Sequence, residues 1–188
     1  NFIMSKLETN TIDNISGSST LTIGDSNTST ITLKSGATLT NFPDNTPAFK
    51  ATLSGDQSIS DNTTVKITFD TETFDTDSAF ASNKFTVPSG EAGKYNIISQ
   101  LTFYDGSDQI TKVVLSIYKN GSAVTEAIFN LSSEDMGRFA LCNSNILDLA
   151  VSDYIEIYGY ADTSDSGTIS ILSGNQQSYF SAYKLIGI

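Results

Sequence analysis

The chain has 188 residues with 16% charged and 38% hydrophobic side chains, no histidine, and a formal net charge of −11 at pH 7. This negative charge argues against nucleic acid and anionic membranes as partners, and the longest apolar runs are too short to span a bilayer. The absence of histidine excludes Ser-His-Asp and Cys-His nucleophile pairs and nearly every zinc site, so we predict no catalytic residues and no enzyme activity.

Residues 1–45 are rich in Ser, Thr, Asn and Gly and repeat one theme, "TLTIG", "TITLKSG" and "ATLTN". Alternation of threonine with leucine or isoleucine predicts short β-strands with one apolar face, formed by Leu21, Ile23, Ile31, Leu33 and Leu39. Such thin strands cannot bury this face alone, so it must meet identical copies about an axis or a docking partner. We predict an attachment and trimerisation foot over residues 1–45; the alternative is a flexible Ser/Thr linker.

Residues 46–188, after the prolines of "NFPDNTPAF", have the pattern of an all-β domain. "VKITFD" predicts a strand with Val65, Ile67 and Phe69 pointing inward, and "GKYNIISQLTFYD" predicts a strand that buries every second residue from Tyr95 to Phe103. The pair Asn120-Gly121 is a strong hairpin signal. So many short antiparallel strands predict a sandwich or jelly roll.

Three tyrosines of "DYIEIYGY" share one face of a predicted strand. Tyr154, Tyr158 and Tyr160 alternate with inward residues and lie beside Glu156. Tyrosine is enriched in protein interfaces, so we predict that these residues form the seam of a trimer. The alternative is an exposed ligand platform, on which a sugar could stack.

Acid-rich loops, "TETFDTDS" and "ADTSDSG", offer the remaining candidates for chemistry. Calcium could bind through Asp75, Asp77, Asp162 and Asp165, because hard oxygen ligands suit that ion. The alternatives are a carboxylate pair of a glycosidase and ordinary solvated loops. Our prediction is no cofactor, with Ca²⁺ as the alternative. Cys142 is the single cysteine, which excludes an internal disulfide, and we predict a small buried residue there.

Six motifs occur in a characteristic order: "PAFKATL", "VKITFD", "KFTVPSGEAGKYNI", "VVLSIYKNG", "LDLAVSDYIEIYGY" and "SYFSAYKLIGI". This order resembles the globular head of the C1q and tumour-necrosis-factor (TNF) superfamily over roughly the last three quarters of the chain. The resemblance implies a C1q/TNF-like jelly roll of two antiparallel sheets that assembles as a homotrimer. Two departures stand out: the Gly-Asp before the late strand is Ser152-Asp153 here, and no collagen-like stalk precedes the head.

The Thr-rich segment is similar in composition to the N-terminal segments of short phage fibre and decoration proteins. We therefore predict a non-enzymatic structural protein of a phage virion, a trimeric short fibre or capsid-decoration spike. Its N-terminal segment would dock on a capsid or tail protein, and its head would project outward. The first alternative is a receptor- or carbohydrate-binding module, with a host surface glycan or receptor as partner; the second is a secreted C1q-like recognition protein.

Overall fold

The computed structural model describes residues 45–131 and 135–186. The chain divides into two compact units, Asn1–Asn41 and Phe42–Ile188, and all described residues lie in the second. The predicted strands that carry Leu21, Ile23, Ile31, Leu33 and Leu39 therefore lie outside the described residues.

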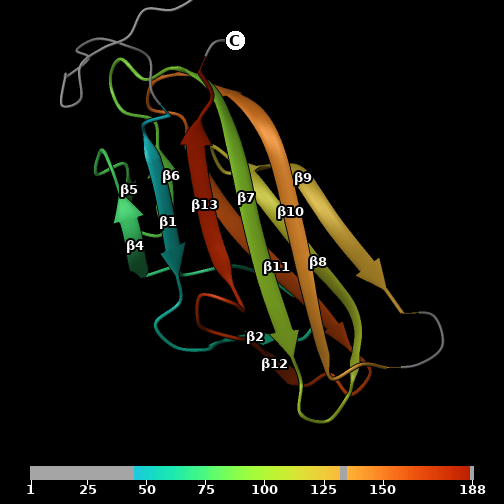
Figure 1. The fold of residues 1–188 in the computed structure, drawn as a ribbon. Coiled ribbons are helices and arrows are strands. Elements are labelled where there is room, and N and C mark those ends of the chain that lie inside the picture. The colour runs from blue at the N-terminus through green and yellow to red at the C-terminus, as the bar shows by residue number, and fades with distance from the viewer. Residues whose placement is uncertain (1–44, 132–134, 187–188) are drawn as a thin grey trace, which may run out of the picture. The chain divides into compact units, whose positions relative to one another are not determined.

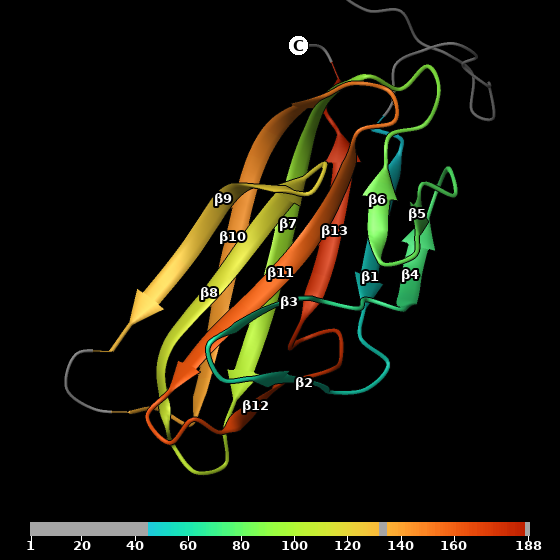
Figure 2. The same ribbon diagram turned by 180° about the vertical axis from the view of Figure 1, so that it is seen from behind.

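Two antiparallel sheets form the described part of the chain, which contains strands and turns but no helix (Figures 1 and 2). The first sheet has the order β2 (Gln57–Ser60), β12 (Thr168–Ile171), β7 (Gly93–Tyr104), β13 (Tyr179–Lys184), β1 (Ala48–Thr52) and β4 (Thr71–Asp75), and β10 (Arg138–Leu149) also pairs with β7. The second sheet has the order β5 (Phe80–Ala81), β6 (Lys84–Thr86), β11 (Tyr154–Thr163), β8 (Ile110–Lys119) and β9 (Ser122–Asn130), and β3 (Thr63–Lys66) also pairs with β11. The predicted all-β sandwich is confirmed.

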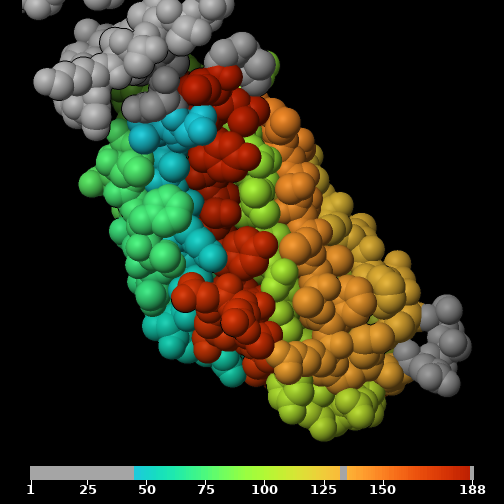
Figure 3. All heavy atoms as spheres, in the orientation of Figure 1, coloured from blue at the N-terminus to red at the C-terminus, as the bar shows by residue number. Residues whose placement is uncertain are grey.

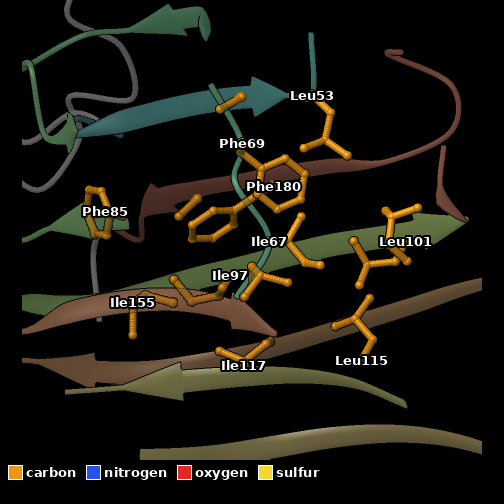
Figure 4. Packing of buried hydrophobic residues seen from close by; sticks show 14 of the residues in the cluster. Leu53, Ile67, Phe69, Phe85, Ile97, Leu101, Leu115, Ile117, Ile155 and Phe180 are labelled. Carbon is orange, nitrogen blue, oxygen red and sulfur yellow. The ribbon is translucent and has the colours of Figure 1, made fainter. Parts of the chain in front are cut away.

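The hydrophobic core fills the space between the two sheets (Figure 4). Tyr95, Ile97, Leu101 and Phe103 of β7 are fully buried, as their alternation predicted. Aromatic rings occupy one part of this core, where the rings of Phe49 and Phe80 stack with their centroids 4.8 Å apart. The space between the sheets is therefore occupied by apolar side chains of both sheets.

The hairpin between β8 and β9 turns at the predicted dipeptide. Asn120 and Gly121 both have positive φ, 51° and 80°, as a two-residue hairpin turn of the I′ type requires. This turn pairs Lys119 with Ser122, and a register shift between Ile117 and Tyr118 then sets the pairs beyond it, including Ser116 with Glu126.

The predicted strand from Val65 to Asp70 ends early, at Lys66. Ile67 and Phe69 are buried as expected, but the N–H of Thr68 donates to Oε1 of Gln57, at 2.8 Å, instead of to a neighbouring strand. The chain crosses here from the second sheet to β4 of the first sheet. The prediction was wrong at this end because the side chains continue to alternate between inward and outward after the backbone has stopped pairing with a neighbouring strand.

Cys142 was predicted to be buried, and this was wrong, because the structure exposes it. It lies on β10 opposite Gln100, between the inward residues Leu141 and Asn143. Because the inward residue Asn143 is polar, the sequence of this strand does not show alternation of apolar and polar residues. The prediction therefore relied on cysteine being a residue type that is usually buried.

Candidate functional site

The three predicted tyrosines lie together on the outer face of the second sheet. Tyr154, Tyr158 and Tyr160 are half-buried, whereas Ile155, Ile157 and Gly159 between them point into the sandwich. The sharing of one face is thus as predicted. Their use as a trimer seam stays a prediction.

A groove runs along β8 on this same face, next to Tyr160 (for the strands, see Figure 2). Its floor consists of the short side chains of Val114 and Ser116, and Lys112 and Tyr118 of the same strand border it. These four residues are two apart along β8, so they point to one side of the sheet. We call this hollow the β8 groove; its volume is about 270 Å³.

Longer side chains on the neighbouring strands form the walls of the β8 groove. Tyr160 and Thr64 line the side of β11 and β3, and Glu126 and Ile128 line the side of β9. The pairing explains the shape, because Val114 lies directly between Tyr160 and Ile128 in the register of the three strands. Small residues flanked by large ones produce a hollow.

The exposures of the floor residues are consistent with this shape. Val114 is 7% exposed and Ser116 is 4% exposed, although both point away from the core. By contrast, Ile128 in the wall is 51% exposed. The walls therefore rise over the floor and shield it from solvent.

The groove holds one positive and one negative side chain. Nζ of Lys112 lies 5.2 Å from the centroid of the Tyr160 ring, and the carboxylate of Glu126 accepts a hydrogen bond from Oγ of Ser116 at 3.1 Å. Burial, and secondarily Asp162 and Asp61, raise the pKa of the Tyr160 hydroxyl. This hydroxyl donates to Oδ1 of Asn62 at 2.7 Å. It therefore stays protonated well above neutral pH.

A partly buried ion pair lies on the sheet surface beside the groove. Nζ of Lys66 lies 2.7 Å from Oε1 of Glu156, and the carboxylate side chain is only 11% exposed. Burial, followed by Glu156, raises the pKa of Tyr158. The rings of Tyr158 and Tyr118 pack against each other, with centroids 4.0 Å apart and their planes tilted by 31°. One face of the Tyr118 ring is thus fixed by a neighbour, and its position at the groove is set.

The outer face of the first sheet is a second candidate site, which was not among the sites predicted from the sequence (Figure 3). Four large apolar or aromatic side chains are exposed on it: Phe74, Tyr104, Ile146 and Tyr183. We call this surface the apolar face. Each of the four comes from a different strand, so only the pairing of β4, β7, β10 and β13 brings them to one surface. The outward alternation of "YFSAYK" was the one signal for it in the sequence.

The four predicted calcium ligands lie in two separate places. Asp75 pairs with Phe49 at the start of β1, and Asp162 pairs with Lys112 at the start of β8, toward opposite ends of the sheets (Figure 1). The carboxylate of Asp75 accepts the N–H groups of Ala79 and Phe80, which closes a turn. Similarly, Asp165 accepts the N–H of Gly167 at 2.9 Å, and Asp77 accepts the hydroxyl of Thr76 at 2.5 Å.

Within residues 45–131 and 135–186, no group of three or more His, Cys, Asp or Glu side chains is placed to share a metal ion. The structure thus gives three of the predicted ligands local roles in turns and does not bring the four together. Among the described residues there is also no helix long and apolar enough to cross a membrane.

Comparison with solved structures identifies the architecture. The globular domain of zebrafish complement 1qA protein superposes with a TM-score of 0.52 and 13% identity, covering 76% of this chain and 99% of that one. Eiger TNF from S. frugiperda superposes with a TM-score of 0.54 and 12% identity, covering 75% of this chain and 93% of that one.

Murine APRIL superposes equally well, with a TM-score of 0.54 and 12% identity over 73% of this chain and 98% of that one. The chain has the C1q/TNF-like jelly-roll fold. No protein-family model matches the sequence, and no curated protein matches it. At these identities the C1q/TNF likeness concerns the fold, so the use of each face must be argued from this chain's own residues.

Proposed function

We propose that this protein is a non-enzymatic C1q/TNF-like head that assembles as a homotrimer through the apolar face. The observation that carries the proposal is the exposure of large apolar side chains on the outer face of the first sheet, where Ile146 of β10 is 57% exposed. Large apolar side chains that are exposed together on one face mark interaction sites in soluble proteins.

The pairing of the strands places three of the four side chains, Phe74, Ile146 and Tyr183, in two neighbouring rows. Tyr183, Asn96 and Ile146 lie in one row across β13, β7 and β10, and Nδ2 of Asn96 donates to the Tyr183 hydroxyl at 3.0 Å. The next row runs from Phe74 through Lys50, Ser181 and Ile98 to Ser144. Only one charged side chain, Lys50, occurs in these two rows. Depletion of charge together with aromatic and aliphatic side chains is typical of the centre of an interface.

We propose three subunits because the resemblance to the C1q/TNF superfamily implies a homotrimer, and a closed ring would cover the apolar face of every subunit. In a threefold ring the contact is heterologous, so the apolar face of one subunit meets a different surface of the next. The proposal leaves the outer face of the second sheet, with Lys112 and the Lys66–Glu156 ion pair, outside this contact. This arrangement differs from the seam that the tyrosine pattern predicted.

At finer detail, we propose a virion role, as a short fibre or decoration spike docked through residues 1–45. The support is the Thr-rich pattern of that segment, whose alternation predicts strands with an apolar face and too few residues for a core.

The mass of the full chain in solution tests the assembly. We expect light scattering coupled to size exclusion to give three chains, and Ile146→Glu to give one, because a charge would be placed in the seam. Ile128→Glu is the matched control, since Ile128 is 51% exposed on the other sheet. A monomeric wild-type chain, or a trimer that survives Ile146→Glu but not Ile128→Glu, would contradict the proposal.

The virion role has a separate test. The native protein should co-sediment with intact particles on a density gradient, in a copy number divisible by three. If it is found only in particle-free fractions, the virion role is wrong, and the trimeric head is unaffected.

A further inference from the structure

We propose that the β8 groove binds the end of a neutral glycan, with one sugar ring lying over Val114 and Ser116 and against Tyr118. This activity goes beyond the assembly of the trimer. It uses the opposite sheet, so the two functions do not compete for surface.

The lining of the groove is complementary to both the apolar faces and the hydroxyl-bearing edge of a sugar ring. A pyranose presents apolar C–H groups on its faces and hydroxyl groups around its edge. Val114, Ile128 and the Tyr118 ring supply apolar contact, and aromatic rings add favourable contacts beyond the area that they bury. Ser116, Glu126 and Lys112 supply a hydroxyl, a carboxylate and an ammonium group for the ring's hydroxyls.

The hydrogen-bonding groups of the groove are already held in position. The hydrogen bond from Ser116 orients the Glu126 carboxylate, which retains further acceptor sites for sugar hydroxyls. Tyr118 is held by its packing against Tyr158. Because these side chains are ordered before any ligand arrives, binding loses less conformational entropy.

Charge selects a neutral ligand over an anionic one. Lys112 and Glu126 balance each other within the groove. The chain as a whole carries a net charge of −11, which repels sialylated and sulfated glycans. An uncharged sugar meets no such barrier.

The size of the groove suits a small ligand rather than a second copy of this chain. Its volume, about 270 Å³, is close to the lower end of the roughly 300–1,000 Å³ typical of small-molecule sites. A stable contact between proteins needs a far larger flat area, on the order of 800 Å² per partner. A glycan end can enter between the walls, and the rest of the glycan can continue along the open side.

The experiment is a glycan array probed with the full trimeric chain, followed by calorimetric titration of the strongest ligand. The array carries oligosaccharides ending in glucose, galactose, mannose or N-acetylglucosamine, beside sialylated and sulfated ones. We expect binding to neutral members only. No binding in titrations at up to about 10 mM sugar, or a preference for anionic members, overturns the proposal.

Two pairs of variants locate the site. Tyr118→Ala should weaken binding by about tenfold, and Val151→Ala, at an exposed position in the turn between β10 and β11, should leave it unchanged. Glu126→Gln keeps the shape of the groove and should also weaken binding, whereas Glu72→Gln on β4 should not. Unchanged affinity in both groove variants would overturn the proposal. Trimer mass measured on the same samples separates loss of the site from loss of assembly.

Discussion

The side-chain amide of Asn143 donates a hydrogen bond to the backbone carbonyl of Leu115 at 3.1 Å, joining a strand of the first sheet to a strand of the second. The same Nδ2 also lies 3.3 Å from the carbonyl oxygen of Thr125. Asn143 is 7% exposed and points inward from β10. It therefore fastens the two sheets where β10 approaches β8 and β9.

Replacing this amide should destabilise the fold. We expect Asn143→Ala to lower the free energy of unfolding by about 1–3 kcal/mol, because buried carbonyl groups would lose their donor. Urea unfolding followed by circular dichroism measures the change. Asn130→Ala, at an exposed position of β9, is the control and should change the stability by less than about 0.5 kcal/mol. Equal effects of the two substitutions would show that the amide bridge contributes nothing.

Ser152 occupies a backbone conformation that favours glycine. Its φ is +70°, and it stands where the resembling family has glycine in its Gly-Asp pair. We expect Ser152→Gly to raise the free energy of unfolding by about 0.5–1 kcal/mol, because a residue with a Cβ is strained there. Ser58→Gly in β2 should have the opposite sign, since glycine weakens a strand. A thermal melt of both variants decides the matter, and destabilisation by Ser152→Gly would contradict the strain argument.

Asp153 should make the fold sensitive to acid. Hydrogen bonds from Lys119, Asn120 and the N–H of Ala150 lower the pKa of this carboxyl group to about 2. Because this pKa lies below the unfolded value, the ionised group stabilises the folded state above about pH 4, and this contribution disappears as pH falls toward 2. We expect Asp153→Asn to cost about 1 kcal/mol at neutral pH and progressively less in acid.

The comparison for this prediction is Asp148→Asn. Asp148 pairs with Lys94 at 3.3 Å but is 77% exposed, so its removal should have little effect at any pH. Denaturation midpoints at several pH values give both curves. If the stability difference between Asp153→Asn and the wild type does not depend on pH, the assigned role of Asp153 is wrong.

Gly159 lies between Tyr158 and Tyr160 of β11 and faces the core without a side chain. A Cβ at this position would lie 3.1 Å from Cδ1 of Ile67 and 3.2 Å from Cδ1 of Leu101. We expect Gly159→Ala to destabilise the fold by about 1–3 kcal/mol through overpacking. At Gly55 a Cβ would meet nothing within 4 Å, so Gly55→Ala serves as the control. Differential scanning fluorimetry compares the two, and a neutral Gly159→Ala would mean that the core has room to adjust.

Much of the fold followed from the alternation of side chains within single strands. The buried residues from Tyr95 to Phe103, the shared face of Tyr154, Tyr158 and Tyr160, and the hairpin at Asn120 and Gly121 were all predicted in this way. Each depends on local spacing alone, which a sequence displays directly.

The candidate sites could not be predicted, because they depend on pairing between strands. Ser116 becomes the floor of a groove only through its position between Tyr158 and Glu126, which are 42 and 10 residues away along the chain. Similarly, Ile146 and Tyr183 come together only across β7. Alternation identifies the outward face of a strand but not its neighbours. For Cys142, the inward asparagines of β10 hid even the alternation.

The alternation of β8 has a consequence for how this protein can change in evolution. Val114 and Ser116 form the groove floor, while Leu115 and Ile117 between them belong to the core. Insertion or deletion of a single residue within this strand would exchange the two sets, placing serine in the interior and leucine in the solvent. Length variation among descendants should therefore concentrate in the turns. Point substitutions at positions 114 and 116 can reshape the β8 groove while the interior remains intact.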